Sequence, residues 1–301
     1  MTSVRNICLL GLGEVGSLLG VQLSGSADVE VVAWDRQFDD PASGPSRNAV
    51  GAGLRQATSA DTAAKGCQLV ISAVTAAQAL DAARSLLPGL SPGTWFVDLN
   101  SVSPATRRLV AEVVEEAGGR YVEVAVMSPI RPAGLASPML AGGPHAQDFV
   151  PLARTLGFSG LAFCADGIGR ASATKLCRSV VVKGLESLLV ESLLAARYYG
   201  VDEAVIDSLG NLLPQVDWKE RARYMISRSL EHGARRAEEM REAARTVAES
   251  GINGWMSEAC ARSQAHAARW SQAAGNGELA SMLDAMLGLR SDNPIEGKQA
   301  G

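Results

Sequence analysis

The chain has 301 residues, of which 47% are hydrophobic and 20% are charged, and its formal net charge is -4. This length leaves room for two domains, and the composition is that of an ordinary globular protein rather than a disordered one. No basic surplus points to nucleic acid as the main partner. The five scattered cysteines form no CxxC or Cys/His cluster, so we expect neither a metal site nor a disulfide framework.

The sequence offers no sign of export or of membrane insertion. The N-terminal MTSVRN precedes only a short apolar run that is broken at Gly11, which is too short for the core of a signal peptide. No stretch is long and apolar enough to span a bilayer. The cysteine usage is typical of a reducing compartment. We therefore expect a cytoplasmic protein without a membrane partner.

The first half of the chain alternates predicted strands and helices. Runs rich in β-branched and aromatic residues predict strands at 6–10, 29–35, 67–74, 94–100 and 120–127. Helical spacing of apolar residues predicts helices at 14–26, 76–87 and 104–119, the last opened by Ser103 as cap and Pro104 as first helical residue. This alternation predicts the α/β class, with a parallel, doubly wound sheet covered by helices on both faces.

Three glycines follow the first predicted strand. Gly11 permits the tight turn, Gly13 lets a pyrophosphate approach the backbone, and Gly16 lets the helix pack closely on the strand. The N-terminus of the following helix supplies N–H groups and a partial positive charge for the phosphates. A lone GxGxxG can be an ordinary turn. Here, however, the glycines follow a predicted strand and precede a predicted helix, and a second strand then ends in an acidic residue, and this order predicts a nicotinamide dinucleotide site. Its predicted phosphate loop consists of Gly11, Leu12, Gly13, Glu14, Val15 and Gly16.

Asp35 and Arg36 bear on the choice between NAD and NADP. Asp35 ends the second predicted strand, where a carboxylate accepts hydrogen bonds from the adenosine ribose. Its charge would repel a 2′-phosphate, which favours NAD. Arg36 could instead bind that phosphate and stack on the adenine, or be a solvated surface charge. We predict NAD as the cofactor, with NADP as the other possibility.

The second half of the chain changes character after about residue 165. Segment 169–200 predicts one long helix that is apolar on much of its circumference, as in helices buried by another domain or subunit. Further helices follow, one of them over about 217–251 with a break near Gly233. We predict a dinucleotide-binding domain over 1–165 and an all-helical substrate and dimerisation domain over 166–301. The helical domain can hardly cover the long helix alone, so we expect a homodimer or higher homo-oligomer.

These segments together resemble the β-hydroxyacid dehydrogenase family, which includes 6-phosphogluconate and 3-hydroxyisobutyrate dehydrogenases, over nearly the whole chain. The resemblance rests on ICLLGLGEVGSLLGVQL, VISAVTAAQAL, FVDLNSVSPATRRL, YVEVAVMSPIRPAGLASPMLAGG and GIGRASATKLCRS. The stretch HGARRAEEM further resembles a poorly characterised branch known only as phosphogluconate-dehydrogenase-like. The motifs imply a Rossmann fold and an NAD(P)-dependent reaction, but they name no substrate.

The resemblance marks Lys175 as the catalytic residue. Hydride transfer from a secondary alcohol needs the hydroxyl proton removed, or returned on reduction. A lysine can do this where burial or a neighbouring cation brings its pKa towards the working pH. In SATKLCRSVVV the lysine lies among small and apolar residues, where it is costly unless it points into a cavity. The alternative is that its stem lies along the surface and its amine reaches solvent.

The resemblance also implies substrate contacts, with two departures from the family pattern. The family usually has asparagine four residues after the lysine, where this chain has Ser179. Its substrate strand usually reads Asp-x-Pro-Val-Ser-Gly-Gly, whereas EVAVMSPI places Met127 in the position of the serine, with Ser128 next to it. We therefore expect a substrate less polar than a simple hydroxy acid. The predicted substrate contacts are Asn100, Met127, Ser128, Ser179 and Arg236.

Other polar residues leave two interpretations open. Asn100 and Ser101, at a strand end, could polarise the substrate, bind the nicotinamide ribose or belong to a capping turn. Val74 and Thr75 lie at the end of the predicted VISAV strand, within the segment that resembles the one under the nicotinamide ribose, and a capping turn is again the alternative.

His232 and Arg236 lie four residues apart on one face of a predicted helix. They could close over a substrate anion. Equally, they could pair with Glu239 or Asp202 as structural charges.

We therefore predict an NAD(P)-dependent oxidoreductase that transfers hydride reversibly between the nicotinamide and a hydroxyl or carbonyl carbon of a small organic substrate. Lys175 would be the general acid or base, and Asn100, Ser128 and Ser179 would orient the reacting oxygen. The first alternative is an imine reductase on the same scaffold, although such enzymes usually lack the lysine. The second is a dinucleotide-binding or sensing protein without turnover.

Overall fold

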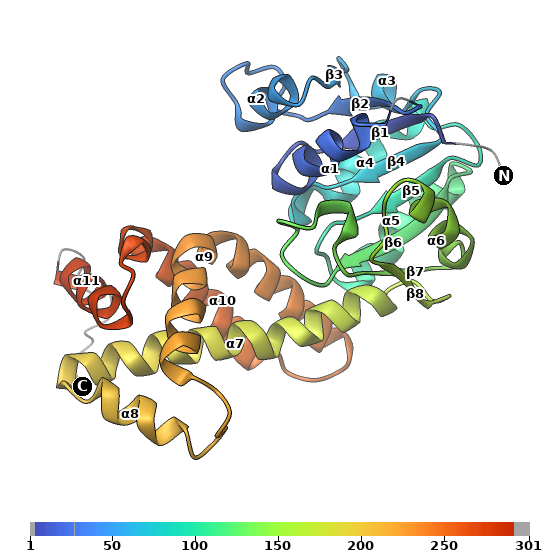
Figure 1. Ribbon diagram of the computed structural model, residues 1–301. Coiled ribbons are helices and arrows are strands. Elements are labelled where there is room, and N and C mark those ends of the chain that lie inside the picture. Colours follow the sequence, from blue (N-terminus) through green and yellow to red (C-terminus); the bar gives the residue numbers. More distant parts are fainter. Residues whose placement is uncertain (1–3, 27, 292–301) are drawn as a thin grey trace, which may run out of the picture. The chain divides into compact units, whose positions relative to one another are not determined.

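The computed structural model describes residues 4–26 and 28–291, and these form two compact units (Figure 1). Unit 1 comprises the described residues up to Leu176, and unit 2 those from Cys177 onwards. Within the described chain every strand lies in unit 1, and unit 2 is helical. The predicted succession of an α/β domain and an all-α region is confirmed. The boundary after residue 165 stays a prediction.

Unit 1 is built on one sheet, which has eight strands within the described chain, in the order β3-β2-β1-β4-β5-β6-β7-β8. The strands are β1 (Asn6–Leu10), β2 (Glu30–Trp34), β3 (Arg55–Gln56), β4 (Leu69–Ser72), β5 (Trp95–Asp98), β6 (Arg120–Val126), β7 (Met139–Gly142) and β8 (Leu161–Ala165). Because β1 pairs with β2 on one side and β4 on the other, the winding reverses at β1. Ligands of such sheets bind at this switch point, beyond the carboxyl ends of the strands.

The sheet departs from the predicted parallel arrangement at one position. β6 and β7 are antiparallel, with Val126 opposite Met139. A parallel neighbour needs a crossover of about a dozen or more residues, usually a helix, whereas an antiparallel neighbour needs only a loop. Segment 127–138, all of which is described, contains one 3-10 turn, η3 (Gly134–Ala136), and no helix that could cross the sheet.

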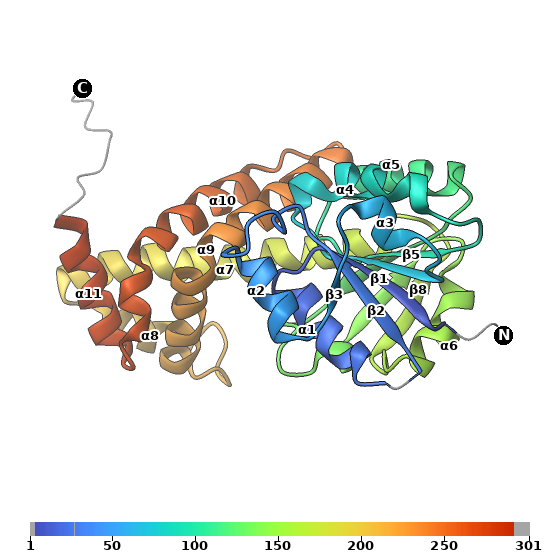
Figure 2. The same cartoon turned by 90° about the horizontal axis from the view of Figure 1, so that it is seen from above.

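Helices cover both faces of the sheet, as predicted (Figure 2). On one face, α1 (Glu14–Ser24) and α6 (Ala146–Thr155) send leucine, phenylalanine and valine side chains into one buried cluster. On the other face, α3 (Ala60–Ala64), α4 (Ala79–Leu86) and α5 (Pro104–Glu116) share a second buried cluster that is rich in alanine.

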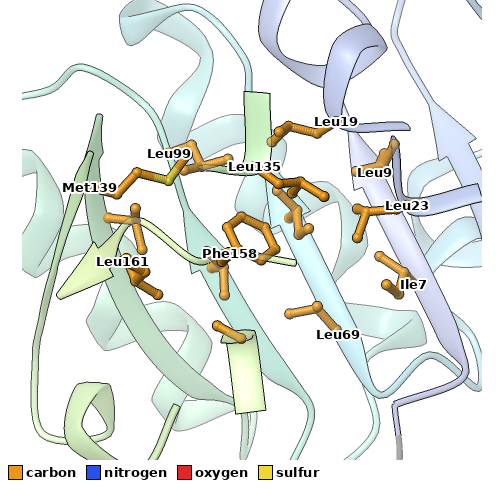
Figure 3. Packing of buried hydrophobic residues seen from close by; sticks show 14 of the residues in the cluster. Ile7, Leu9, Leu19, Leu23, Leu69, Leu99, Leu135, Met139, Phe158 and Leu161 are labelled. Carbon is orange, nitrogen blue, oxygen red and sulfur yellow. The ribbon is translucent and has the colours of Figure 1, made fainter. Parts of the chain in front are cut away.

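The cluster under α1 and α6 holds the sheet in register (Figure 3). The ring of Phe158 lies in the middle of the group, among leucine side chains that include Leu69 of β4 and Leu135 of η3. Full burial of a side chain of this size stabilises the fold by about 1.5–3 kcal/mol. The core therefore fixes the strand ends from which the candidate site is built.

Several short elements have too weak a pattern to be predicted from sequence. The two residues of β3 are exposed, β8 is only partly buried, and α3 has five residues. None of these shows a period of 2 or 3.6 over a useful length. The other elements of unit 1 that the sequence analysis missed are α2 (Gly44–Gly51), α6, β7 and η3. The helix predicted over 76–87 is divided into η1 (Ala76–Gln78), α4 and the start of η2 (Leu87–Gly89). Ser103 does cap α5, as predicted.

Unit 2 contains most of the long helix predicted over 169–200, which the structure confirms. The helices are α7 (Arg170–Tyr199), α8 (Asp202–Leu209), α9 (Trp218–Glu249), α10 (Trp255–Ala267), the 3-10 segment η4 (Ala268–Gly275) and α11 (Leu279–Ser291). The core of this unit is led by Leu193, Ile226, Met282 and Leu283, none of which is exposed. No helix formed by the described residues is long and apolar enough to cross a membrane.

The predicted break near Gly233 is wrong, because α9 continues unbroken through this position. A Cβ atom on Gly233 would lie 2.3 Å from the carbonyl oxygen of Gln264 in α10. The glycine therefore serves close packing of two helices. A glycine with this role cannot be told from a helix breaker in the sequence, because both read as a missing side chain inside a helical pattern.

Candidate active site

The glycine turn lies at the carboxyl end of β1, at the switch point of the sheet. Gly11 has φ +94, a conformation that suits glycine, and its N–H donates to the carbonyl oxygen of Trp34 at 2.9 Å. The N–H of Leu12 donates to Oδ2 of Asp35, also at 2.9 Å. Helix α1 begins directly after Gly13, which occupies its cap position. The turn is thus tied to the end of β2 by one main-chain and one side-chain bond.

The three glycines differ in what surrounds them. A Cβ on Gly16 would lie 1.9 Å from the carbonyl oxygen of Gly11, and a Cβ on Gly11 would lie 2.6 Å from that of Ala73. Both glycines are therefore required by the packing of the protein itself. A Cβ on Gly13 would meet no described atom within 4 Å, so this position faces open space. Among the described residues no side chain caps α1, which leaves its first N–H groups for an anion. A pyrophosphate fits such a cradle.

Asp35 and Arg36 are both engaged near the turn. The carboxylate of Asp35 accepts from the N–H of Leu12 and from the N–H of Gln37, the latter at 3.0 Å. Arg36 is exposed, and its Nη1 donates to Oε1 of Gln78 at 2.8 Å. Because Gln78 is neutral, the charge of Arg36 is not neutralised by this contact. The preferences for NAD and NADP that the sequence analysis assigned to the two residues stay predictions.

Asn100 joins the carboxyl ends of β4 and β5. Its Oδ1 accepts from the N–H of Val74 at 2.7 Å, and its Nδ2 donates to Oγ of Ser72 at 3.0 Å. Its side chain is buried. A Cβ on Gly11 would lie 2.8 Å from Cγ1 of Val74, so the Val74–Thr75 segment borders the glycine turn. Asn100 therefore holds this segment in place, and its predicted contact with substrate or ribose stays a prediction.

Lys175 lies near the start of α7, within unit 1, and is half-buried. Its Nζ donates to Oγ of Ser101 at 2.6 Å, a contact across 74 positions of sequence. Ser101 is the residue after Asn100, in the segment that follows β5. The structure thus brings together the segment after β5 and the lysine helix, which the resemblance had placed separately. The sequence analysis named Ser101 but did not foresee it as the partner of the lysine, because nothing local links the two.

A buried group of four polar side chains lies behind this contact, and we call it the strand-end cluster. Its members are Asp98 of β5, Arg107 of α5, and Tyr121 and Glu123 of β6. Each is at most 1% exposed. Nη1 of Arg107 lies 2.9 Å from Oδ1 of Asp98, and the hydroxyl of Tyr121 donates to Oδ2 of the same carboxylate at 2.9 Å. The sequence analysis missed this cluster.

Electrostatics in the strand-end cluster favour a charged arginine. Burial by itself opposes the charge of Arg107, but Asp98, Tyr121 and Glu123 outweigh it and raise the pKa of the guanidinium above its ordinary value. Burial, followed by the negative charge of Asp98, raises the pKa of the Tyr121 hydroxyl well above its usual value. The tyrosine therefore stays a neutral donor to Asp98.

Met127 and Ser128 lie where β6 ends and the 127–138 loop begins. The N–H of Met127 donates to the carbonyl oxygen of Pro138 at 2.9 Å, which continues the β6–β7 pairing by one residue. The hydroxyl of Ser128 donates to the carbonyl oxygen of Pro129 at 3.1 Å. Both side chains are partly exposed. Their predicted contacts with substrate stay predictions.

In unit 2, Ser179 and Arg236 belong to a set of buried and partly buried polar groups between helices. Oγ of Ser179 accepts from Nζ of Lys183 at 3.2 Å, and Lys183 pairs with Glu239 at 2.6 Å. Arg236 pairs with Glu186. The pairing that the sequence analysis weighed for Arg236 is therefore present, but its partner is Glu186 rather than Glu239 or Asp202.

His232 lies on the same helix as Arg236, and its Nε2 is 3.6 Å from Oε2 of the adjacent Glu231. Asp202, the other partner considered for this pair, is held instead by Arg197 at 3.3 Å. Over the part of the chain that the structure describes, no group of three or more His, Cys, Asp or Glu side chains is placed to hold a metal ion.

Comparison with known proteins identifies two segments. Residues 6–154 match the NAD binding domain of 6-phosphogluconate dehydrogenase, and residues 196–267 match a domain of unknown function (DUF1932). The first match contains the glycine turn, Asp35 and the strand-end cluster.

Three relatives match two thirds or more of this chain. A conserved hypothetical protein from Sinorhizobium meliloti 1021 is 32% identical, with 96% of this chain and 97% of that chain covered and a TM-score of 0.75. A conserved protein of unknown function, whose structure is described as similar to 3-hydroxyacid dehydrogenases, is 30% identical over 90% of this chain and all of its own, with a TM-score of 0.66. Glyoxylate/succinic semialdehyde reductase 2 of Arabidopsis thaliana is 25% identical over 67% of this chain and 56% of its own length.

Two further solved structures share the fold at 19% identity, each with 94% of this chain and 99% of its own covered. They are a 3-hydroxyisobutyrate dehydrogenase of Mycobacterium tuberculosis, with a TM-score of 0.70, and an imine reductase of Streptomyces aurantiacus, with a TM-score of 0.56.

Proposed function

The chain belongs to the β-hydroxyacid dehydrogenase family and binds NAD(P), and on this premise we propose that it transfers hydride reversibly between the nicotinamide and a carbonyl or hydroxyl carbon of a small organic substrate. The bound nicotinamide supplies or accepts the hydride. The protein contributes the proton, the orientation of the reacting oxygen and the binding of both partners. The observation that carries the proposal is the 2.6 Å contact between Nζ of Lys175 and Oγ of Ser101.

In this proposal Lys175 is the general acid or base. A half-buried amine that already makes a short hydrogen bond to a hydroxyl is placed to make the same bond to a substrate hydroxyl or carbonyl oxygen. Ser101 would hold the amine in place and share the reacting oxygen with it. On reduction the amine would donate its proton to that oxygen, and on oxidation it would accept the proton. Ser128 and Ser179 are proposed to orient the substrate.

The substrate class is proposed from two features. Met127 stands where the family usually has a serine, so one polar contact expected of a hydroxy acid is replaced by an apolar one. The relative from Arabidopsis thaliana is named as a reductase of glyoxylate and succinic semialdehyde, which are small aldehydes that carry a carboxylate. We propose a small aldehyde or ketone with an apolar portion near Met127.

The first test is Lys175→Met. Methionine fills a similar volume without the amine, so the variant should fold and still bind cofactor. Turnover of a carbonyl substrate found in a panel screen should fall by about 10²–10⁴-fold, the usual contribution of a positioned acid or base. A change in KM alone would mean that Lys175 only binds substrate, and unchanged turnover would remove it from the mechanism.

The cofactor site is tested by Gly13→Val. The open space at Gly13 means that the valine side chain should be tolerated by the fold but should occupy the place of the pyrophosphate. Cofactor affinity, followed by fluorescence of the reduced nicotinamide, should fall by at least about tenfold, or 1.4 kcal/mol. Normal binding by this variant would place the cofactor elsewhere. Gly44→Ala, at another glycine with open space around it, is the matched control.

The proposed preference for NAD rests on Asp35. Replacement by serine removes the charge that repels a 2′-phosphate and leaves Arg36 in place. Asp35→Ser should therefore shift the ratio of NAD to NADP affinities towards NADP. A wild-type protein that already binds NADP much more tightly than NAD would show that Arg36 dominates.

An imine reductase is the second candidate, and the fold shared with a known imine reductase is the observation that favours it. The two reactions differ in the acceptor, C=N against C=O. Screening cyclic imines beside aldehydes and ketones with both cofactors, at the nicotinamide absorbance, separates them. Cofactor binding without turnover across the whole panel would instead favour a dinucleotide-sensing protein.

We also propose that the protein is a homodimer or larger, in the cytoplasm. Val181, Leu188 and Tyr199 of α7 are 71%, 55% and 76% exposed, and their spacings of seven and eleven residues place them on one side of the helix. Large apolar side chains in a row on a helix are costly to leave in water. Sedimentation should give at least twice the monomer mass at micromolar concentration, and Leu188→Glu should lower it. A wild-type monomer would refute the proposal.

A further inference from the structure

The strand-end cluster touches both sides of the Lys175–Ser101 contact. On one side Arg107 donates from Nη2 to the carbonyl oxygen of Asn100, the residue directly before Ser101. Its Nη1 donates to the carbonyl oxygen of Asp98, two residues earlier. The guanidinium thus holds the main chain of the segment that ends β5 and presents the serine hydroxyl.

On the other side, Glu123 holds the start of the lysine helix. Its Oε1 accepts from the N–H of Gly169 at 2.8 Å and from the N–H of Ala171 at 3.1 Å. Ala171 lies one helical turn before Lys175. A carboxylate at a helix N-terminus satisfies N–H groups that have no partner within the helix and is attracted by the helix dipole. A Cβ on Gly142 would lie 2.6 Å from Oε1 of Glu123, so the neighbouring strand leaves room for this arrangement.

Arg107 and Glu123 also face each other. Nε of Arg107 lies 3.8 Å from Oε2 of Glu123, within ion-pair distance. Neither of these two atoms makes a hydrogen bond to another described group, so the pair is held by charge alone. A continuous path therefore runs from the main chain before Ser101, through the guanidinium and the carboxylate, to the first turn of the lysine helix.

We propose that Arg107 and Glu123 are positioning residues that set the distance between the Ser101 hydroxyl and the Lys175 amine. The inference rests on the proposed role of Lys175. Three charged side chains buried to this extent are weak stabilisers, because desolvation offsets most of their mutual attraction, and apolar residues of similar volume often serve stability as well. Rigid support for a catalytic contact explains their presence better, since misplacement of a reacting group by about 1 Å can cost 100-fold in rate.

The test measures the lysine itself and needs no substrate. Trace acetylation of the full-length protein, followed by peptide mass spectrometry, gives the reactivity of Lys175 relative to the exposed Lys65 and Lys219. Glu123→Gln keeps the shape of the side chain and an acceptor oxygen but removes the charge. Arg107→Lys keeps the charge, but its single amine cannot replace the two bonds that Nη1 and Nη2 make to the carbonyl oxygens of Asp98 and Asn100. Each should loosen the Ser101 contact and raise the relative reactivity of Lys175 by about three- to tenfold, because an amine released from its hydrogen bond is more accessible to the reagent; a tenfold change corresponds to about 1.4 kcal/mol. Unchanged reactivity in both would overturn the proposal.

Tyr121→Phe is the matched control. It removes the hydroxyl that donates to Asp98 and that also contacts the Arg107 guanidinium, while the bonds of Arg107 to the carbonyl oxygens of Asp98 and Asn100 and those of Glu123 to the start of α7 stay in place. It should lower the unfolding midpoint while leaving Lys175 reactivity unchanged. If it raised the reactivity as much as Glu123→Gln does, general loosening would be the cause and the proposal would be wrong.

The wild type supplies a measurement that does not depend on a variant folding. The first N–H groups of a helix usually exchange rapidly, because they lack acceptors. If Glu123 holds these groups, the hydrogen-exchange rates of the amides of Gly169 and Ala171 should lie within about tenfold of the rate of Val97, a core amide in β5. Such a rate is close to the one set by global unfolding. Rapid exchange at both would overturn the proposal. A normal turnover of Lys175→Met would instead refute the proposed catalytic role of the lysine, which keeps the two failures distinct.

Discussion

The two units bury their charges in different ways. In unit 1 the charges of the strand-end cluster are held largely by main-chain groups, since Arg107 donates to carbonyl oxygens of the β5 end and Glu123 accepts from N–H groups of the α7 start. In unit 2 the buried charges are held by other side chains, with Lys183 paired to Glu239 and Arg236 paired to Glu186.

This difference reflects the two architectures. Strand ends and helix starts leave main-chain groups without partners, and a buried charge can satisfy them. Packed helices have already satisfied their main chain, so a charge between them must find another side chain. Lys183 illustrates this, because its amine lies 2.6 Å from Oε2 of Glu239 and donates to Oγ of Ser179 at 3.2 Å. We therefore expect the loss of a charge held by the main chain to lower the free energy of unfolding by more than the loss of a charge held by another side chain.

The largest expected effect sharpens this comparison. Arg107→Met removes bonds to several carbonyl oxygens and leaves Asp98 and Glu123 buried without their counter-ion. The free energy of unfolding should fall by about 5 kcal/mol, the upper end for breaking a buried pair. Chemical denaturation measures the loss. A loss below that of Arg236→Met would show that the main-chain contacts add nothing.

Arg236→Met should cost about 3 kcal/mol, because it leaves one carboxylate, Glu186, in a buried site with Gln264 as a remaining donor. Arg235 is the matched control. It is the adjacent residue, its side chain is 51% exposed, and it pairs with Glu239, so Arg235→Met should cost less than about 1 kcal/mol. Equal losses for the two arginines would contradict the view that burial decides the outcome.

The pH dependence of this loss has a definite sign. Burial, only partly offset by Arg236, raises the pKa of Glu186 above its ordinary value. A carboxyl group with a raised pKa in the folded state contributes stability below its unfolded pKa and loses it as the pH rises through the folded pKa. Without the arginine this effect should grow, so Arg236→Met should be more destabilising at pH 7 than at pH 5. The same loss at both values would mean that Glu186 stays ionised throughout.

Two helical glycines of unit 2 test close packing. Gly233→Ala places a Cβ against α10 and should destabilise the protein by about 1–3 kcal/mol, the usual cost of overpacking. Gly184 lies in α7, where a Cβ would meet no described atom within 4 Å. Gly184→Ala should therefore stabilise by about 0.5–1 kcal/mol, because alanine loses less backbone entropy in a helix. Thermal denaturation of both variants gives the comparison, and the same sign for both would refute it.

The smallest expected effect concerns His232. Partial burial, followed by the positive charges of Arg228 and Arg235, lowers the pKa of this imidazole below its ordinary value. The unfolded chain then takes up the proton at a higher pH than the folded protein, so stability is lost as the pH falls below about 6.5. The urea midpoint should therefore fall less between pH 7.5 and 5.5 in His232→Gln than in the wild type. An equal fall would show that this histidine is not involved.

Part of the molecule follows from local sequence alone. The glycine turn could be predicted because Gly11 and Gly16 have steric requirements that appear at fixed spacing beside a strand and a helix. The main strands and helices of unit 1 and the length of α7 could be predicted because hydrophobic periodicity is a local property. The short elements β3, β8 and α3 have no such period, and Gly233 was misread because its reason lies in another helix.

The site itself was decided by tertiary structure. Lys175 and Ser101 are 74 positions apart, and the two charges that border their contact, Arg107 of α5 and Glu123 of β6, come from elements that pack against each other. The family resemblance marked the lysine, but no local pattern states which hydroxyl it meets or which charges support that contact. The sequence by itself determined where strands, helices and the phosphate turn lie, because these depend on neighbouring residues. Only the fold decided which polar groups meet, because a hydrogen bond requires atoms within about 3 Å, and that distance follows from the packing of elements remote in sequence.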